Sequence, residues 1–197
     1  MRYKYEFIRK LIHLSNLVIP LSLFYYDRQF ILILLIPLSV SFIIFDYLRI
    51  NSRKVATFYN KYFFLITRDF EENQLTGASY VFFSSCIIIF IFPKAIAIPS
   101  LLIMSIPDSV AALIGQKYGK IKLFNKTLEG SIAFFLSSIL IIVLLPDIIL
   151  IPALIGAIVS TIIESSNFLD INDNLSVPLS FAVIYFLLEY ILIRGVI

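Results

Sequence analysis

The sequence predicts an all-α integral membrane protein with about seven transmembrane helices and one interfacial amphipathic helix. Hydrophobic residues make up 60% of the 197 residues and charged residues only 15%, whereas soluble domains average about 45–50% and 25%. The apolar residues also form long runs, such as 30–44, 78–92 and 132–145, which approach the ~20 residues that a helix needs to cross a bilayer. Spans and loops use nearly the whole chain, so we expect a single membrane-embedded domain over 1–197.

Seven apolar segments account for the expected spans, in chain order. Each is bounded by charged residues or proline, which favour the membrane surface or interrupt a helix. No small-residue cleavage site follows the first segment, so we expect it to be retained as a helix. The segments are 10–26, 29–47, 75–92, 95–115, 128–145, 148–163 and 175–193.

The segment 52–70, between the second and third spans, has the pattern of an amphipathic helix. Val55, Phe58 and Tyr62 recur at helical spacing, and Arg53 and Lys61 lie among them. Such a helix lies in the membrane interface. It is either a linker that packs on the bundle or one wall of the route by which a lipid reaches a site near the surface.

The basic residues predict the orientation. Thirteen of the 16 Lys and Arg residues fall on one side of the seven-span topology, against Arg28, Lys94 and Arg194 on the other. The positive-inside rule therefore places the N-terminus in the cytoplasm and the C-terminus on the opposite side. Ten of the 13 acidic residues share the cytoplasmic side, although acidic residues contribute little to orientation. We therefore expect a polar reaction centre on that face.

Asp108 lies inside the fourth span, where a carboxylate costs about 2.5–3.5 kcal/mol. It should therefore face a polar cavity or a cation, and Pro107 favours a kink beside it. Asp108, Gly115 and Gly119 lie on one stripe of small residues. Close helix packing explains the glycines equally well, but it does not explain the aspartate.

The fifth span begins with Lys126, Thr127, Leu128, Glu129, Gly130 and Ser131. A helix N-terminus offers unpaired N–H groups that suit a phosphate, and Lys120 and Lys126 add positive charge. The Walker A pattern is missing, so a soluble nucleotide-kinase fold is not indicated.

A third cluster joins the last two spans, with Glu164 followed by Asp170, Asn172, Asp173 and Asn174. The EF-hand pattern fails at its glycine and glutamate positions, but carboxylate and amide oxygens suit Mg²⁺. The alternative is a solvated turn. His13 is the single histidine, and it is a candidate base, a phosphate donor or an interface anchor.

Taken together, these segments resemble the polyprenol kinase family of membrane enzymes, which includes dolichol kinase, phytol kinase and the CTP-dependent diacylglycerol kinases. Five blocks carry the resemblance, in order across almost the whole chain. They are Glu6 to His13; Leu75 to Ala78 preceded by Glu71 and Glu72; Asp108 to Gly119; Lys126 to Ser131; and Glu164 with Asp173, Asn174 and Pro178.

The resemblance implies a membrane-embedded catalytic domain that transfers a phosphoryl group from CTP, with Mg²⁺, to the hydroxyl of a polyprenol, dolichol, phytol or farnesol, or of diacylglycerol. Asp108, Glu164 and Asp173 would hold the metal and act in catalysis with Lys126. Asp173 is favoured over His13 as the base. The nucleotide would contact Arg9, Lys10, Gly115, Gly119, Lys120, Thr127, Glu129, Gly130 and Ser131. Further members of the site would be His13, Glu71, Thr76, Gly77 and Asn174.

Two other functions remain open on the sequence. A phosphatidate cytidylyltransferase also uses CTP and Mg²⁺ in a membrane, but it releases pyrophosphate where a kinase releases CDP. A small lipid or ion transporter would line a route across the bilayer with its acidic residues. The net charge of +3 does not point to a nucleic-acid partner.

Overall fold

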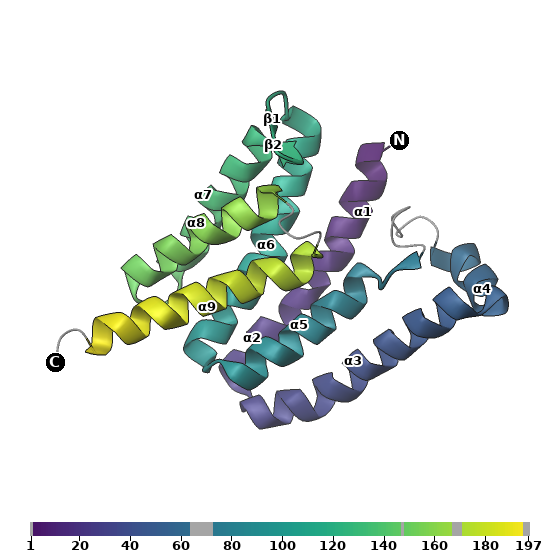
Figure 1. Cartoon of the computed structure of the whole chain (residues 1–197), viewed down its shortest axis with the longest axis horizontal. Helices are drawn as coiled ribbons and strands as arrows, with labels where there is room; N and C mark the ends of the chain where they lie inside the picture. The colour runs from purple at the N-terminus through teal and green to yellow at the C-terminus, as the bar shows by residue number, and fades with distance from the viewer. Residues whose placement is uncertain (1, 64–72, 147, 167–170, 195–197) are drawn as a thin grey trace.

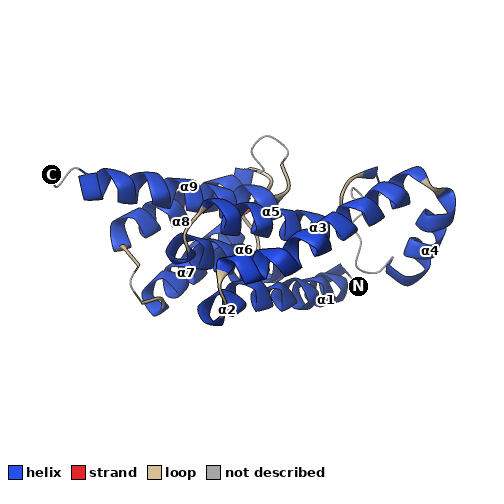
Figure 2. Cartoon of the chain, turned by 90° about the horizontal axis from the view of Figure 1, so that it is seen from below, coloured by secondary structure: helices blue, strands red, loops and turns tan. Residues whose placement is uncertain are grey.

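The fold is almost entirely helical in the computed structural model, which describes residues 2–63, 73–146, 148–166 and 171–194 (Figures 1 and 2). The all-α prediction is confirmed, apart from one two-stranded hairpin. The elements are α1 (Arg2–Leu14), η1 (Ser15–Leu17), α2 (Val18–Tyr25), α3 (Arg28–Asn51), α4 (Arg53–Phe63), α5 (Gly77–Ile91), α6 (Lys94–Tyr118), β1 (Lys122–Leu123), β2 (Lys126–Thr127), α7 (Leu128–Leu144), α8 (Leu150–Ser166) and α9 (Asp173–Arg194).

Within the described part of the chain, four helical segments are long and apolar enough to cross a membrane: Tyr5–Tyr25, Arg28–Asn51, Lys94–Tyr118 and Asp173–Leu192. Helices α5, α7 and α8 are apolar and coincide with the other predicted spans, but they have only 15, 17 and 17 residues. At 1.5 Å per residue they reach about 22–26 Å, less than the ~30 Å of a bilayer core. The predicted count of seven spans therefore stays a prediction.

The helix that contains the start of the first predicted span, 10–26, begins before that span, at Arg2. Glu6 and Arg9 form an ion pair one turn apart, and such pairs favour a helix. The polar segment before residue 10 is therefore an amphipathic extension of the apolar span. Hydropathy alone does not reveal this extension, because the segment is not apolar.

Helix α6 forms the centre of the bundle, and 78% of its most apolar window is buried. It packs against α1, α2, α7 and α9, and it runs between them in Figure 1. Its buried serines donate their hydroxyls to carbonyls one turn back, as in Ser100 to Ile96 and Ser105 to Leu101. The hydroxyls of these serines are thus satisfied within the helix, as an apolar environment requires.

Helix α4 is the described part of the predicted interfacial helix, and residues 64–70 of that prediction lie outside the described residues. Tyr59 is buried and its ring lies 4.9 Å from the Arg49 guanidinium. Phe58 and Tyr62 are exposed. One face of α4 therefore packs on the end of α3, as a linker would, while apolar side chains remain on the surface.

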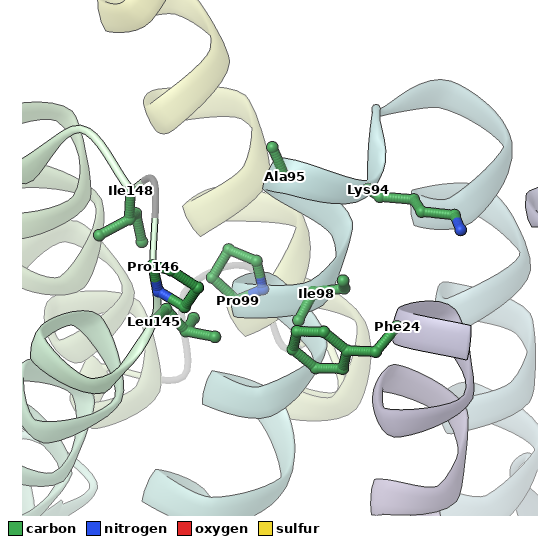
Figure 3. Close-up of a pocket in the computed structure, with 8 residues that line it drawn as sticks. All are labelled: Phe24, Lys94, Ala95, Ile98, Pro99, Leu145, Pro146 and Ile148. Carbon is green, nitrogen blue, oxygen red and sulfur yellow. The ribbon is translucent and has the colours of Figure 1, made fainter. Parts of the chain in front are cut away.

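Arg28 and Lys94 bind backbone carbonyls at the ends of helices. Arg28 donates to the Phe90 carbonyl (2.8 Å) and Lys94 to the Tyr26 carbonyl (2.7 Å), so both cations bind the last carbonyls of helices. The cavity in Figure 3, lined by residues such as Phe24 and Pro99, has a volume of about 60 Å³. Ligand pockets usually have about 300–1,000 Å³, so this cavity is no candidate for the function.

Candidate functional site

The buried Asp108 is paired with a cation, as its place in the span predicted. Lys10 on α1 donates its ammonium to Asp108 Oδ2. His13, one turn further along α1, has its Nε2 3.4 Å from the same oxygen and 3.1 Å from the Met104 carbonyl oxygen. Lys10 and Asp108 are only 5% and 8% exposed. Helix α1 thus supplies the positive charge that the carboxylate of α6 needs inside the bundle.

A second ion cluster joins the hairpin to the end of α8 and the start of α9, which lie far along the chain from it. Lys126 on β2 places its Nζ 2.6 Å from Glu164 Oε1 and 2.7 Å from Asp173 Oδ2. Glu164 ends α8 and is 2% exposed, and Asp173 begins α9. The hairpin, the end of α8 and the start of α9 lie at the same end of the bundle (Figure 1). The structure therefore brings together three of the four predicted catalytic residues.

The two clusters act on each other electrostatically. Burial lowers the pKa of the Lys126 ammonium, but the negative charges of Asp173, Glu164 and Asp108 together raise this pKa above its ordinary value. Lys126 is therefore charged at neutral pH. Because the charge of Asp108 also reaches Lys126, we treat both clusters as one Lys–carboxylate site, which consists of Lys10, His13, Asp108, Lys126, Glu164 and Asp173.

Two carboxylate oxygens of this site have no hydrogen-bond partner among the described residues. Glu164 Oε2 and Asp173 Oδ1 are buried without one, and so is the hydroxyl of Ser131, which the sequence assigned to the nucleotide. A buried polar atom without a partner costs about 1–3 kcal/mol. Such atoms at a candidate site are free to accept from, or coordinate, a ligand.

The predicted metal ligands are not assembled as one group of three. Within the described residues, no three His, Cys, Asp or Glu side chains lie close enough to share a metal ion. Asp108 pairs with Lys10, while Glu164 and Asp173 share Lys126. The sequence predicts that these acids share one side of the membrane, but it could not predict which lysine would separate them.

Residues around the hairpin have structural contacts that the sequence did not predict. The Glu129 carboxylate accepts from the backbone N–H groups of Lys120 (2.9 Å) and Ile121 (3.3 Å). Thr127 caps α7 by accepting from the Gly130 N–H (3.2 Å). The side chain of Lys120 is exposed. Glu129 and Thr127 therefore hold the loop and the helix start in place, and nucleotide contacts by these residues remain a prediction.

The glycines of the predicted site lie where α6 and α7 approach most closely. A Cβ atom would stand 2.8 Å from Thr127 Oγ1 at Gly115, 2.6 Å from Thr127 Cγ2 at Gly119 and 3.1 Å from the Ala111 carbonyl oxygen at Gly130. Separations below 3.0 Å do not fit a side chain. Helix packing therefore requires glycine at 115 and 119, and a nucleotide is not needed to explain them.

Asp46 and Arg49 form a buried network that the sequence analysis missed. Asp46 Oδ2 accepts from the Thr76 N–H (2.7 Å), the Thr76 hydroxyl (2.8 Å) and the Ser79 hydroxyl (2.6 Å). Asp46 Oδ1 accepts from Arg49 Nε (3.1 Å), and Arg49 also donates to the Gln74 carbonyl (2.6 Å). The available signal was an acid and a base one turn apart near the end of an apolar span.

This network reaches the Lys–carboxylate site through the start of α5. Thr76 precedes α5, and the Asn174 side chain on α9 donates to the Gly77 carbonyl (3.2 Å). Asn172 accepts from the Asn174 N–H (3.0 Å) and so caps α9 next to Asp173. Thr76, Gly77 and Asn174 thus support the site from beside it. Of the other predicted residues, Arg9 pairs with Glu6, and Glu71 lies outside the described residues.

The fold and the site define a class: a helical membrane protein with a buried site of lysines and carboxylates at one end of its bundle. The chain belongs to the same family as the uncharacterized protein RP860 of Rickettsia prowazekii, with 33% identity over 202 residues that cover 96% of this chain and 98% of the relative.

A second relative is the CTP-dependent diacylglycerol kinase 1 of Schizosaccharomyces pombe. It is 30% identical over 142 residues, which cover 69% of this chain and 65% of the kinase. This distant similarity supports a lipid-kinase-like family. No family model matches the chain, and no solved structure matches it.

Proposed function

We propose that this protein is a CTP-dependent lipid kinase, which phosphorylates the hydroxyl of an isoprenoid alcohol or of diacylglycerol. The observation that carries the proposal is the Lys–carboxylate site, in which two lysines and three acids from α1, α6, β2, α8 and α9 form two ion clusters that interact electrostatically within a membrane bundle. Phosphoryl transfer depends on positioning and on charge stabilisation by such groups. The similarity to the fission-yeast kinase agrees with this chemistry.

Lys10 and Lys126 would bind the phosphates of the nucleotide. Lys126 is charged at neutral pH and its side chain is 31% exposed, so a polyphosphate can reach it. In the structure, the ammonium groups of Lys10 and Lys126 form ion pairs with carboxylates. When the nucleotide binds, its phosphates would replace these carboxylates as partners of the two lysines. Arg9 lies one residue before Lys10 and would add charge at the same edge.

Asp173 would accept the proton of the attacking hydroxyl. Its Oδ1 is buried without a partner, which leaves an acceptor for a hydroxyl donor. The hydroxyl oxygen forms a bond to the terminal phosphorus while the bond from that phosphorus to the bridging oxygen breaks. CDP leaves with the bridging oxygen, and the hydroxyl proton passes to Asp173.

Glu164 and Asp173 suit Mg²⁺ as a pair. Mg²⁺ usually binds one or two carboxylates and completes its shell with water and substrate phosphates. The unpartnered Glu164 Oε2 fits this donor set. Asp173 Oδ2 would join it once Lys126 binds the phosphates, which leaves Asp173 Oδ1 to accept the proton. When bound, the ion would neutralise charge on the phosphate oxygens. Asp108 forms an ion pair with Lys10, so it would act by positioning that lysine. It would also act through its electrostatic attraction to Lys126.

We place the site on the cytoplasmic side of seven spans, with the N-terminus on that side and the C-terminus opposite. The distribution of basic residues supports this orientation. Single-cysteine labelling at Lys122 and at Asp147 from one side of sealed vesicles tests it. Only one of the two positions should react, and reaction of both would overturn the topology.

A nucleotide assay tests the activity. Purified protein in detergent is incubated with Mg²⁺, CTP labelled at its terminal phosphate, and a panel of polyprenol, phytol, farnesol, diacylglycerol and, for the cytidylyltransferase alternative, phosphatidate. We expect label in one class of lipid and release of CDP. Release of pyrophosphate would instead indicate a cytidylyltransferase, and unchanged CTP with every acceptor would leave a transporter as the better explanation.

A further inference from the structure

The hairpin between α6 and α7 carries three exposed apolar side chains at three-residue spacing. Tyr118 is 57% exposed, Ile121 57% and Phe124 69%. Lys120 and Lys122 lie between them and are also exposed. Aromatic residues and lysines gather where a membrane meets water, whereas lysine is depleted in protein interfaces.

The hairpin holds Phe124 outward in a conformation that does not favour phenylalanine. Its φ is 51°, a left-handed value that is uncommon for bulky residues and better suited to glycine or asparagine. The next residue is fixed, because the Asn125 N–H donates to the Ser165 carbonyl (3.3 Å) and its side chain donates to the Ser166 carbonyl (3.1 Å). The turn is thus fixed at Asn125, and the Phe124 side chain before it stays 69% exposed.

The length of α6 places the hairpin at the depth of the headgroups. Helix α6 has 25 residues and is about 37 Å long, which is about 7 Å more than the hydrocarbon core. With Lys94 at one surface, Tyr118 reaches the opposite surface. At that point Lys117 lies 5.0 Å from the Tyr118 ring centroid, a pairing suited to an interface.

We propose that the hairpin is a membrane anchor that lies in the headgroup layer of an anionic leaflet. Ile121 and Phe124 insert at the boundary between headgroups and acyl chains, while Lys120 and Lys122 face the negative headgroups. Lys126 follows on β2, so the anchor would also hold this lysine near the surface at which a lipid headgroup lies. The proposal rests on the hairpin alone and not on kinase activity.

Depth-dependent quenching tests the anchor. Cys86 is the single cysteine, so Cys86→Ser provides a background for Phe124→Cys, with Lys122→Cys as the matched control two residues away. Each variant is labelled with bimane and reconstituted in phosphatidylcholine–phosphatidylglycerol vesicles. The label at 124 should lose fluorescence to brominated acyl chains at a depth of about 5–10 Å inside the boundary, and it should resist aqueous iodide. The label at 122 should show the reverse.

A second variant tests the anchor with Phe124 in place, because Phe124→Cys removes one of the side chains proposed to insert. Ile121→Cys keeps Phe124, and its label should also lose fluorescence to brominated lipid. Quenching by iodide at both 121 and 124 would overturn the proposal, because the hairpin would then lie in water. Resistance to both quenchers would overturn it as well, because the tip would then be covered by protein.

Discussion

Replacement of Arg49 by methionine should destabilise the protein strongly, independently of any ligand. Asp46 and Arg49 are 1% and 4% exposed, and removal of one partner from a buried ion pair typically costs about 3–5 kcal/mol. Asp46 would keep its three hydrogen bonds from Thr76 and Ser79, which satisfy part of its charge. We therefore expect the free energy of unfolding to fall by about 3 kcal/mol, the lower end of this range.

The assay is reversible unfolding in mixed detergent micelles, followed by helical circular dichroism. The double variant Asp46→Asn with Arg49→Met is the control, because it removes both charges and keeps an acceptor for the Thr76 N–H. Most of the lost stability should return in this variant. A loss below about 1 kcal/mol in Arg49→Met, the level of an exposed pair, would refute the reasoning. So would a double variant at least as unstable as Arg49→Met.

The remaining predictions concern the candidate site. Asp108→Asn should abolish lipid phosphorylation in the labelled-CTP assay, and it should also lower stability, because its buried lysine partner loses a counter-charge. Lys126→Ala should lose about 2–5 kcal/mol of transition-state stabilisation, measured as kcat/KM for the nucleotide, whereas the exposed Lys122→Ala should change it less than tenfold. The stability that Lys126 contributes should be constant through neutral pH and decline only as pH rises above about 10, since its folded pKa is raised above the unfolded value. Gly119→Ala should destabilise the fold, because its methyl group would clash with the Gly115 carbonyl oxygen and stand 2.6 Å from Thr127 Cγ2; equal stability to wild type would show that the end of α6 can shift at no cost.

Several features of the site could be predicted from residues whose burial in an apolar span costs free energy. An aspartate within an apolar span must meet a cation or a polar cavity, so Asp108 was recognisable without a structure. The glycine stripe was equally visible, but its spacing suits both helix packing and phosphate binding. Whether the glycines serve packing or phosphate binding depends on which residues face them. The structure places Thr127 against Gly115 and Gly119, which favours packing.

The sequence by itself determined the membrane class and the approximate positions of the helices, because length and hydropathy set both. The tertiary structure decided the partners. Lys10 and Asp108 are 98 residues apart, and Lys126 bridges two acids that are 38 and 47 residues beyond it. Local patterns report which side chains need a counter-charge, but only the packing of the helices decides which cation is close enough to provide it.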